Sequence, residues 1–236
     1  MCIMKTFLFV SVACSLLFVS CKSDDSKEKS SQPDSTIAES TVVEKVDTVL
    51  SNETISFFNR SGFSDFAKGK SAIFDWRKFH MVNNWKEDSM LTNSFNPEKN
   101  YYEAYGRFLK YSPDSSMFVD LDSYNIDITK DQQGRWVGTE EGPDTEVSLV
   151  FPGKKEKKRL LFLGPGSSVE EAIWTDNENI ALIGFEEAGS EQKKAVVWRY
   201  HIPTSTFFQY ELPDPEAASQ LMGQWRKERL KGILIK

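Results

Sequence analysis

Three pairs of closely spaced carboxylates are the residues with the clearest capacity for chemistry in this chain of 236 residues. Asp120 and Asp122 lie two positions apart, so on an extended strand both side chains project from the same face. With Asp114 or Asp127 they could supply the oxygen ligands that calcium prefers. The segment lacks the spacing of an EF-hand loop, and the alternative is that these are ordinary polar residues at a strand edge and its turn.

The other two pairs, Asp144 with Glu146 and Glu170 with Glu171, could meet across neighbouring strands. Two opposed carboxylates can hydrolyse a glycosidic bond, one as the acid and the other as the base or nucleophile. The sequence does not set the distance between these groups. With 35 acidic and 29 basic residues, the chain also carries many carboxylates that need only keep it soluble, so a surface role is the alternative.

Other kinds of site find little support, and no cofactor is predicted. Cys2, Cys14 and Cys21 all lie near the N-terminus, and His80 and His201 are the only histidines, which argues against a zinc site of Cys and His ligands. The sequence contains neither a Gly-x-Ser-x-Gly motif nor a phosphate-binding loop. Its formal charge of −6 disfavours a nucleic-acid partner, because binding the phosphate backbone needs a basic surface.

The N-terminus has the features of a secretory signal peptide. Lys5 precedes an apolar run from Phe7 to Val19, which as a helix would be about 20 Å long, too short for the roughly 30 Å hydrocarbon core of a bilayer. The run ends in Phe18-Val19-Ser20-Cys21, which resembles the bacterial lipobox. That resemblance implies that residues 1–20 are removed and that Cys21 is acylated. Acylation at Cys14 and an uncleaved anchor helix are the alternatives.

The residues after the cysteine predict where the protein resides. Lys22-Ser23-Asp24-Asp25 resembles the surface-export signal of Bacteroidota lipoproteins. It implies an exported protein that acyl chains on Cys21 anchor in the cell envelope, at the outer membrane, with a periplasmic or a surface orientation left open. Residues 21–50 contain no aromatic residue and predict a disordered tether. Residues 51–236 are then expected to form a single globular β-rich domain.

The sequence of residues 51–236 predicts a mainly β (α+β) fold of antiparallel meander sheets. Short apolar stretches alternate with turn residues such as Pro152-Gly153 and Gly164-Pro165-Gly166. Strands are predicted at 116–122, 146–151, 159–163, 170–175, 180–185, 195–202 and 206–212. A mixed N-terminal region precedes them.

In two segments the apolar residues recur at the spacing typical of a helix. In the mixed region the spacing is carried by Phe74, Trp76, Phe79, Val82 and Trp85, with Asp75 as the N-cap. At the C-terminus, Asp214 and Pro215 suit the start of an amphipathic helix that ends near Gly232. Its apolar face is predicted to pack on the sheet, the alternative being a helix on a membrane surface; that face consists of Ala218, Leu221, Met222 and Trp225.

Two segments also share a sequence pattern, an aromatic residue followed by a turn and then an apolar strand. They are Tyr111–Val119 and Trp174–Leu182, and they resemble the blades of TolB-like and related β-propellers. A closed propeller takes at least about four blades, so the resemblance implies blade-like open sheets, with ordinary hairpins as the alternative. The chain is also similar to uncharacterised Bacteroidota lipoproteins, a likeness that implies no activity; it rests on Asp120–Tyr124, Pro143–Val147 and Gly164–Glu171.

Two hypotheses for the function follow. The first is a non-enzymatic, lipid-anchored module that binds an envelope protein or glycan; for a glycan, exposed aromatic rings could serve as a stacking platform, although such rings are as often core residues. The candidates for that platform are Trp136, Trp174, Trp198 and Tyr200. The second is an envelope hydrolase that uses paired carboxylates or bound calcium. A cleft that holds at least two of the six carboxylates, one with a strongly shifted pKa, would favour the enzyme.

Overall fold

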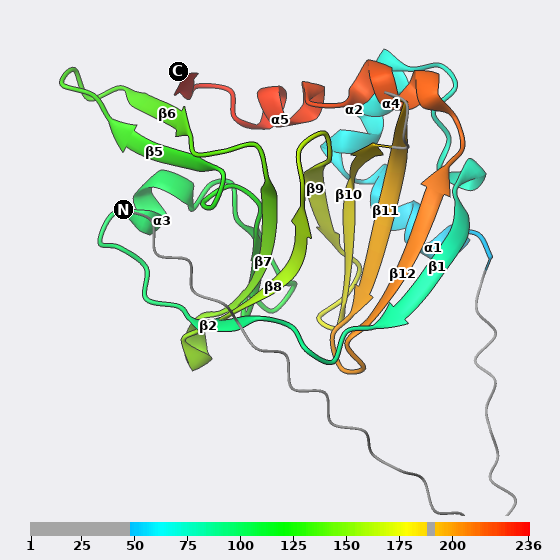
Figure 1. Cartoon of the computed structure of the whole chain (residues 1–236), viewed down its shortest axis with the longest axis horizontal. Coiled ribbons are helices and arrows are strands. Elements are labelled where there is room, and N and C mark those ends of the chain that lie inside the picture. Colours follow the sequence, from blue (N-terminus) through cyan, green and yellow to red (C-terminus); the bar gives the residue numbers. More distant parts are fainter. Residues whose placement is uncertain (1–47, 188–191) are drawn as a thin grey trace, which may run out of the picture. The chain divides into compact units, whose positions relative to one another are not determined.

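The computed structural model describes residues 48–187 and 192–236, and Figure 1 shows how their helices and sheets are arranged. The described chain starts in contact with the domain, because Val49 pairs with His80 and Leu50 is only 3% exposed. The signal peptide, Cys21 and nearly all of the predicted tether lie outside the described residues. Among the residues that are described, no helix combines the length and the apolar character needed to cross a bilayer.

Two N-terminal helices cover one face of the first sheet. Helix α1 (Asn52–Asn59) and helix α2 (Gly62–Lys70) each begin after a serine whose side chain accepts a hydrogen bond from the first helical turn. Phe58 and Phe63 are fully buried beneath them, against the ring of Trp76. The mixed N-terminal region therefore begins with helices that bury their aromatic side chains on the sheet.

The first sheet, sheet A, is antiparallel in the order β1-β12-β11-β10-β9. Its strands are β1 (His80–Lys86), β9 (Ser168–Trp174), β10 (Asn179–Glu187), β11 (Lys193–His201) and β12 (Thr206–Leu212). Both faces are buried: Ile183 and Val197 face the helices, whereas Leu182 and Trp198 face the second sheet. This explains why β10 and β11 are apolar at consecutive positions.

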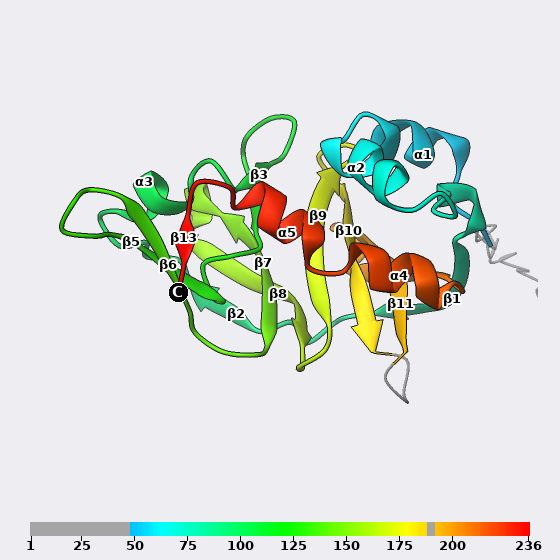
Figure 2. The same ribbon diagram turned by 90° about the horizontal axis from the view of Figure 1, so that it is seen from above.

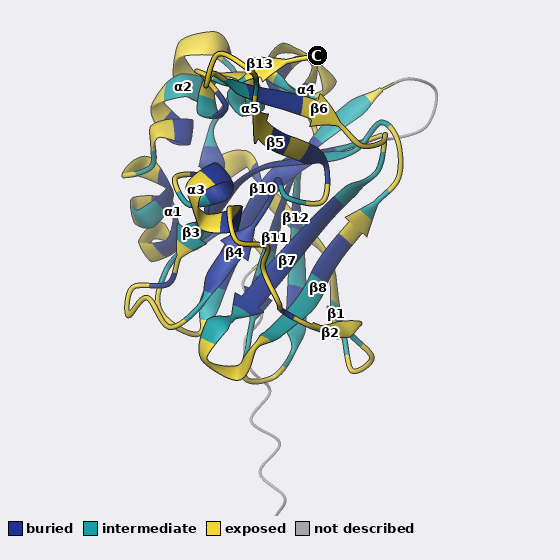
Figure 3. Cartoon of the chain, turned by 90° about the vertical axis from the view of Figure 1, so that its left-hand side faces the viewer, coloured by how far each residue is buried: buried dark blue, intermediate teal, exposed yellow. Residues whose placement is uncertain are grey.

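The second sheet, sheet B, is antiparallel in the order β2-β8-β7-β4-β3 and packs against sheet A through a shared core. Its strands are β2 (Thr92–Ser94), β3 (Lys110–Tyr111), β4 (Phe118–Asp120), β7 (Thr145–Phe151) and β8 (Glu156–Leu163), with a 3₁₀ turn, η2 (Pro152–Lys154), between the last two. Figure 3 shows that the buried residues concentrate along β4, β7 and β10, in the middle of the two sheets.

A third layer covers the far side of sheet B. It contains helix α3 (Tyr101–Tyr105) and a small sheet in which β5 (Ile126–Lys130) and β6 (Trp136–Glu140) form a hairpin. The last strand, β13 (Leu234–Ile235), pairs in parallel with β6. A separate aromatic core holds this layer in place, and its largest members are Phe95, Tyr101, Tyr105, Phe108 and Phe118.

The C-terminal segment packs on the sheets, as predicted, but it is not one helix. Helix α4 (Pro215–Leu221) is separated from helix α5 (Gln224–Arg229) by Gly223, whose φ of 72° belongs to the left-handed region. Asp214 caps α4 as expected, and Leu221 is fully buried. Figure 2 shows that α5 then runs from α4 towards β6, where the chain ends as β13.

The fold class and all the predicted strands are confirmed, and one predicted helix is wrong. Asp75 caps only a short 3₁₀ turn, η1 (Trp76–Lys78), and the chain continues as β1. There the Trp85 ring stacks on Phe207 of β12, with 4.9 Å between ring centroids. Pairing with β12 therefore overrides the helical spacing of the aromatic residues.

The two segments that resemble propeller blades are hairpins in different sheets. Tyr111–Val119 spans β3 and β4 of sheet B, and Trp174–Leu182 spans β9 and β10 of sheet A. Among the described strands the order within each sheet gives no closed propeller. The architecture is two packed antiparallel sheets with helices on one side and a small sheet on the other.

Candidate functional site

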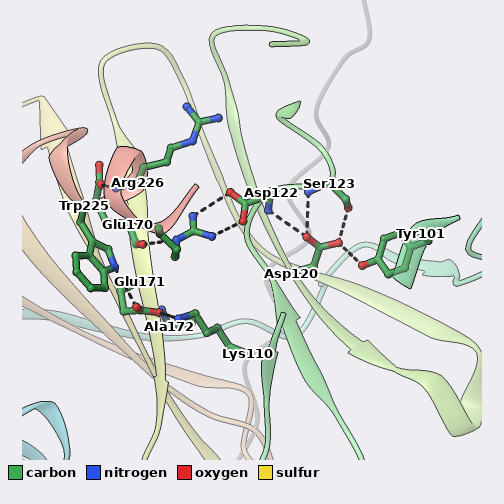
Figure 4. A network of polar contacts seen from close by, with 11 residues as sticks. Tyr101, Lys110, Asp120, Asp122, Ser123, Glu170, Glu171, Ala172, Trp225 and Arg226 are labelled. Atoms are coloured by element: carbon green, nitrogen blue, oxygen red, sulfur yellow. Dashed lines mark hydrogen bonds and ion pairs between the residues drawn. The ribbon is translucent and has the colours of Figure 1, made fainter. Parts of the chain in front are cut away.

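Four of the six candidate carboxylates lie in one buried polar network, which Figure 4 shows. Arg229 of α5 forms a two-pronged ion pair with Asp122, just beyond the end of β4. Its Nε also donates to the backbone carbonyl of Glu170, at 3.2 Å. Burial alone would lower the pKa of the Arg229 guanidinium, but the charge and hydrogen bonds of Asp122, together with the charges of Glu171 and Glu170, outweigh it and raise that pKa. This arginine therefore stays charged and ties the C-terminal segment to both sheets.

Asp120 is saturated by donors from its own loop and from α3. The Tyr101 hydroxyl donates to its Oδ2 at 2.6 Å, and the Ser123 hydroxyl donates to the same atom. The backbone N–H groups of Asp122 and Ser123 donate to Oδ1 at 3.1 and 3.0 Å. Burial, with the charge of Asp120 as the second cause, holds the pKa of Tyr101 far above its usual value. Tyr101 is therefore a hydrogen-bond donor and not a phenolate nucleophile.

Glu170 and Glu171 hold the start of α5 against β9. The fully buried Glu170 accepts hydrogen bonds from the backbone N–H of Gly223 at 2.7 Å and of Arg226 at 2.8 Å. Glu171 accepts the indole N–H of Trp225 at 3.0 Å and pairs with the Lys110 ammonium at 2.7 Å. Both carboxylates thus complete the fold around the interrupted C-terminal helix.

The remaining pair, Asp144 just before β7 and Glu146 on it, is not part of this network. Glu146 pairs with Arg159 at 2.7 Å and with Lys157 at 3.2 Å, and it accepts the Ser148 hydroxyl at 2.9 Å. Burial alone would raise the pKa of Glu146, but these partners together hold it below its usual value. Asp144 is half-buried, and its backbone carbonyl accepts a hydrogen bond from Asn125.

These contacts indicate that the carboxylates stabilise the fold. A glycosidase acid needs a raised pKa, whereas that of Glu146 is lowered, and Asp120, Asp122, Glu170 and Glu171 each have two or more donors from the protein. Within residues 48–187 and 192–236, no three His, Cys, Asp or Glu side chains are grouped so that they could hold a metal ion.

A cleft of about 640 Å³ lies between α3, the β5–β6 hairpin and the loop before α3. We call it the Tyr101 cleft. Of the six candidate carboxylates, it contains only Asp120. Polar groups dominate its wall: Ser94, Asn96, Glu98, Asn100, Tyr101, Glu103, Asp120, Ser123, Asp127, Thr129, Lys130 and Lys157, with Trp136 among the apolar members. Its volume falls within the roughly 300–1,000 Å³ of small-ligand sites.

Several polar groups of the Tyr101 cleft are available to a ligand. Asn96, Glu98 and Asn100 are exposed, and the structure gives their side chains no hydrogen bond to any described residue. In contrast, Lys130 pairs with Glu103 and lies 4.6 Å from the centre of the Trp136 ring. Sequence analysis did not single out this loop as part of a site, because a dipeptide such as Asn96-Pro97 predicts only a turn or loop.

The predicted aromatic platform is divided by the fold. Trp198 and Tyr200 are each 1% exposed and belong to the core between the two sheets. Trp136 lines the Tyr101 cleft, and Trp174 lines a second hollow beside α5. The four rings therefore do not form one surface.

Similarity to other proteins assigns no family to this chain. Comparisons with protein-family models, with curated proteins and with solved structures find no match to it. A function must therefore rest on the chemistry of the described site and on the N-terminal sequence.

Proposed function

We propose that this protein is a lipid-tethered, non-enzymatic binding module of the bacterial cell envelope, and that its ligand is a glycan held in the Tyr101 cleft. The observation that carries the proposal is the wall of that cleft, in which amide, hydroxyl and carboxylate side chains surround a hollow of about 640 Å³. Tethering rests on the lipobox-like Phe18-Val19-Ser20-Cys21.

The chemistry of the wall favours a polyhydroxylated ligand. Most small-molecule sites are lined chiefly by hydrophobic side chains with a few polar groups, whereas polar side chains are the majority in this cleft. Asn96 and Asn100 each offer a donor and an acceptor in one plane, a pattern that suits a sugar with neighbouring hydroxyls. Trp136 at the rim adds an aromatic surface.

The alternative, a hydrolase that uses paired carboxylates or calcium, has less support. A catalytic pair needs two carboxyl groups in one cleft with different proton affinities. The Tyr101 cleft contains four carboxylates, Glu98, Glu103, Asp120 and Asp127, but only Asp120 belongs to the candidate pairs, and Glu103 is already paired with Lys130. The oxygens of Asp120 are already occupied by Tyr101 and by the loop that follows β4. Binding without turnover is the function that these contacts favour.

Ligand binding is tested by removing two side-chain amides that make no hydrogen bond to any described residue, those of Asn96 and Asn100. We expect the Asn96→Ala/Asn100→Ala variant to bind short envelope oligosaccharides at least about tenfold more weakly than the wild type, because each lost hydrogen bond costs roughly 1 kcal/mol or more. The oligosaccharides are made by partial acid hydrolysis of the bacterium's own envelope polysaccharides, and calorimetry gives the affinities.

The matched control is Asn83→Ala/Asn84→Ala, which removes two exposed amides from β1, outside the cleft. It should bind like the wild type, and all three proteins should melt at the same temperature. Glycan binding in the Tyr101 cleft is ruled out if the wild type binds no oligosaccharide, or if the cleft variant binds as tightly as the control.

Anchoring is tested at the cysteine. We expect Cys21→Ser to move the protein from the membrane fraction to the soluble fraction, because the thiol that carries the acyl chain is gone and hydrophobic anchoring is lost. Cell fractionation and intact-mass measurement follow the change, with Cys14→Ser as the control. Retention of the Cys21→Ser protein in salt-washed membranes would contradict acylation at Cys21 and would leave acylation at Cys14 or an uncleaved anchor helix as the explanation.

A further inference from the structure

A second hollow, of about 510 Å³, lies where α2, β3, β9 and α5 meet. We call it the Trp225 groove. Aromatic and small apolar residues dominate its wall, which includes Tyr111, Pro113, Ile173, Trp174 and Trp225. Its two charged members, Lys110 and Glu171, neutralise each other at 2.7 Å. The groove is therefore an aromatic surface with no net charge.

Hydrogen bonds to the protein hold both indole rings of the Trp225 groove in place. The Trp174 N–H donates to the backbone carbonyl of Lys110 at 2.8 Å, and the Trp225 N–H donates to Glu171 at 3.0 Å. Trp225 also packs edge-on against Phe63, with 5.8 Å between ring centroids. Since neither N–H is free, these rings can offer a ligand only their carbon surfaces, in positions that are already set.

A row of tyrosines joins the Trp225 groove to the Tyr101 cleft. Tyr101 contacts Tyr102 with 5.2 Å between ring centroids, and both Tyr102 and Tyr111 pack against the buried ring of Phe118. Tyr102 is 47% exposed and Tyr111 43%. Burial raises the pKa of Tyr111, and the nearby Tyr102 adds to that rise. Two exposed rings, Tyr102 beside the buried Tyr101 and Tyr111 in the wall of the Trp225 groove, are thus linked through the buried Phe118.

We propose that the two hollows are subsites for a single extended polysaccharide, which crosses Tyr102 and Tyr111 between them. This inference rests on the proposed glycan function of the Tyr101 cleft. Pyranose rings have C–H faces that pack on aromatic carbon and hydroxyls that need polar partners, and the two hollows offer one kind of partner each. An uncharged groove of fixed rings also gives nothing that would select a charged peptide.

Two linked subsites make affinity depend on chain length, because the second contact is then intramolecular. We therefore expect long size fractions of hydrolysed envelope polysaccharide to bind at least about tenfold more tightly, per chain, than the shortest fraction that binds. Tyr102→Ala and Tyr111→Ala should remove that gain and leave the affinity for the shortest fraction unchanged. Calorimetry on the size fractions, with the full mature chain, measures both effects.

The matched control is Tyr124→Ala. Tyr124 is also 43% exposed, but it packs on Phe162 of β8 and lines neither hollow. This variant should keep the full gain with chain length. Tyr111→Leu retains apolar packing on Phe118 and keeps the test valid if the alanine variant melts early.

The outcomes separate the two proposals. If short and long fractions bind equally, or if the Tyr102 and Tyr111 variants keep the gain, the extended-chain inference is wrong, while binding of the short fraction still supports the Tyr101 cleft. If no fraction binds, both proposals are wrong. A gain that is lost in the Tyr102 and Tyr111 variants and kept in Tyr124→Ala supports the inference.

Discussion

Replacing Arg229 with alanine is expected to lower the free energy of unfolding by about 3–5 kcal/mol, because it leaves the buried Asp122 carboxylate without a counter-charge. A domain of this kind has only about 5–15 kcal/mol in total, so the melting temperature should fall steeply. The change also removes the donor to the Glu170 carbonyl, at the point where α5 crosses β9. Urea denaturation followed by tryptophan fluorescence measures the loss.

The control for this prediction is Arg226→Ala, one turn earlier on the same helix. Arg226 pairs with Glu140, whose side chain is 54% exposed, and surface pairs contribute at most about 1 kcal/mol. Replacing both members of the buried pair, as Asp122→Leu/Arg229→Met, should cost less than Arg229→Ala, since no charge is then left unpaired. Equal stability of Arg229→Ala and Arg226→Ala would show that the buried ion pair does not hold the C-terminal segment.

Ending the chain after Pro213 is expected to have the largest effect of all and to prevent folding. The deletion uncovers the face of sheet A against which Ala217, Ala218 and Leu221 are fully buried. Truncating one buried leucine alone costs about 2–5 kcal/mol. The deletion also leaves the fully buried Glu170 without the N–H donors of Gly223 and Arg226. Insoluble protein, or soluble protein without a cooperative melting transition, is the expected result.

The matched change at the same end of the chain is Leu234→Ala. Leu234 is 53% exposed, so this variant should melt within a few degrees of the wild type. If the truncated protein melts normally, α4 and α5 do not stabilise the domain. The alternative of a membrane-surface helix, with Leu221, Met222, Trp225 and Leu230 as its contact face, would then be the better interpretation.

Local pattern was enough to predict most strands of the two large sheets. β10 and β11 contain continuous apolar runs, whereas β7 and β12 mix apolar with polar residues, and the ends of all four strands lie close to the predicted ones. The interpretation of residues 74–85 failed for a non-local reason. The helical spacing is real, but the partner that decides the conformation, Phe207, lies far along the chain on β12.

The candidate site was predictable by residue type and not by arrangement. Five of the six carboxylates stabilise the fold through hydrogen bonds or ion pairs. The partners of Asp122 and Glu171 are distant in sequence. Asp122 meets Arg229 across 107 positions, and Glu171 meets Trp225 across 54. No local pattern encodes such pairs. Asn96 and Asn100 carried no signal beyond that of a loop, because exposed amides become a site only where the fold makes a cleft beside them.

The most direct test of the proposed function is to map where a sugar binds. Amide chemical shifts of the labelled mature domain would be followed as short envelope oligosaccharides are added. We predict that the shifted resonances cluster in residues 94–105 and 127–136, which border the Tyr101 cleft, and that β1 and α1 stay unchanged. Saturable shifts confined to another surface, or no shifts at any concentration, would contradict the assignment of this cleft as a glycan site.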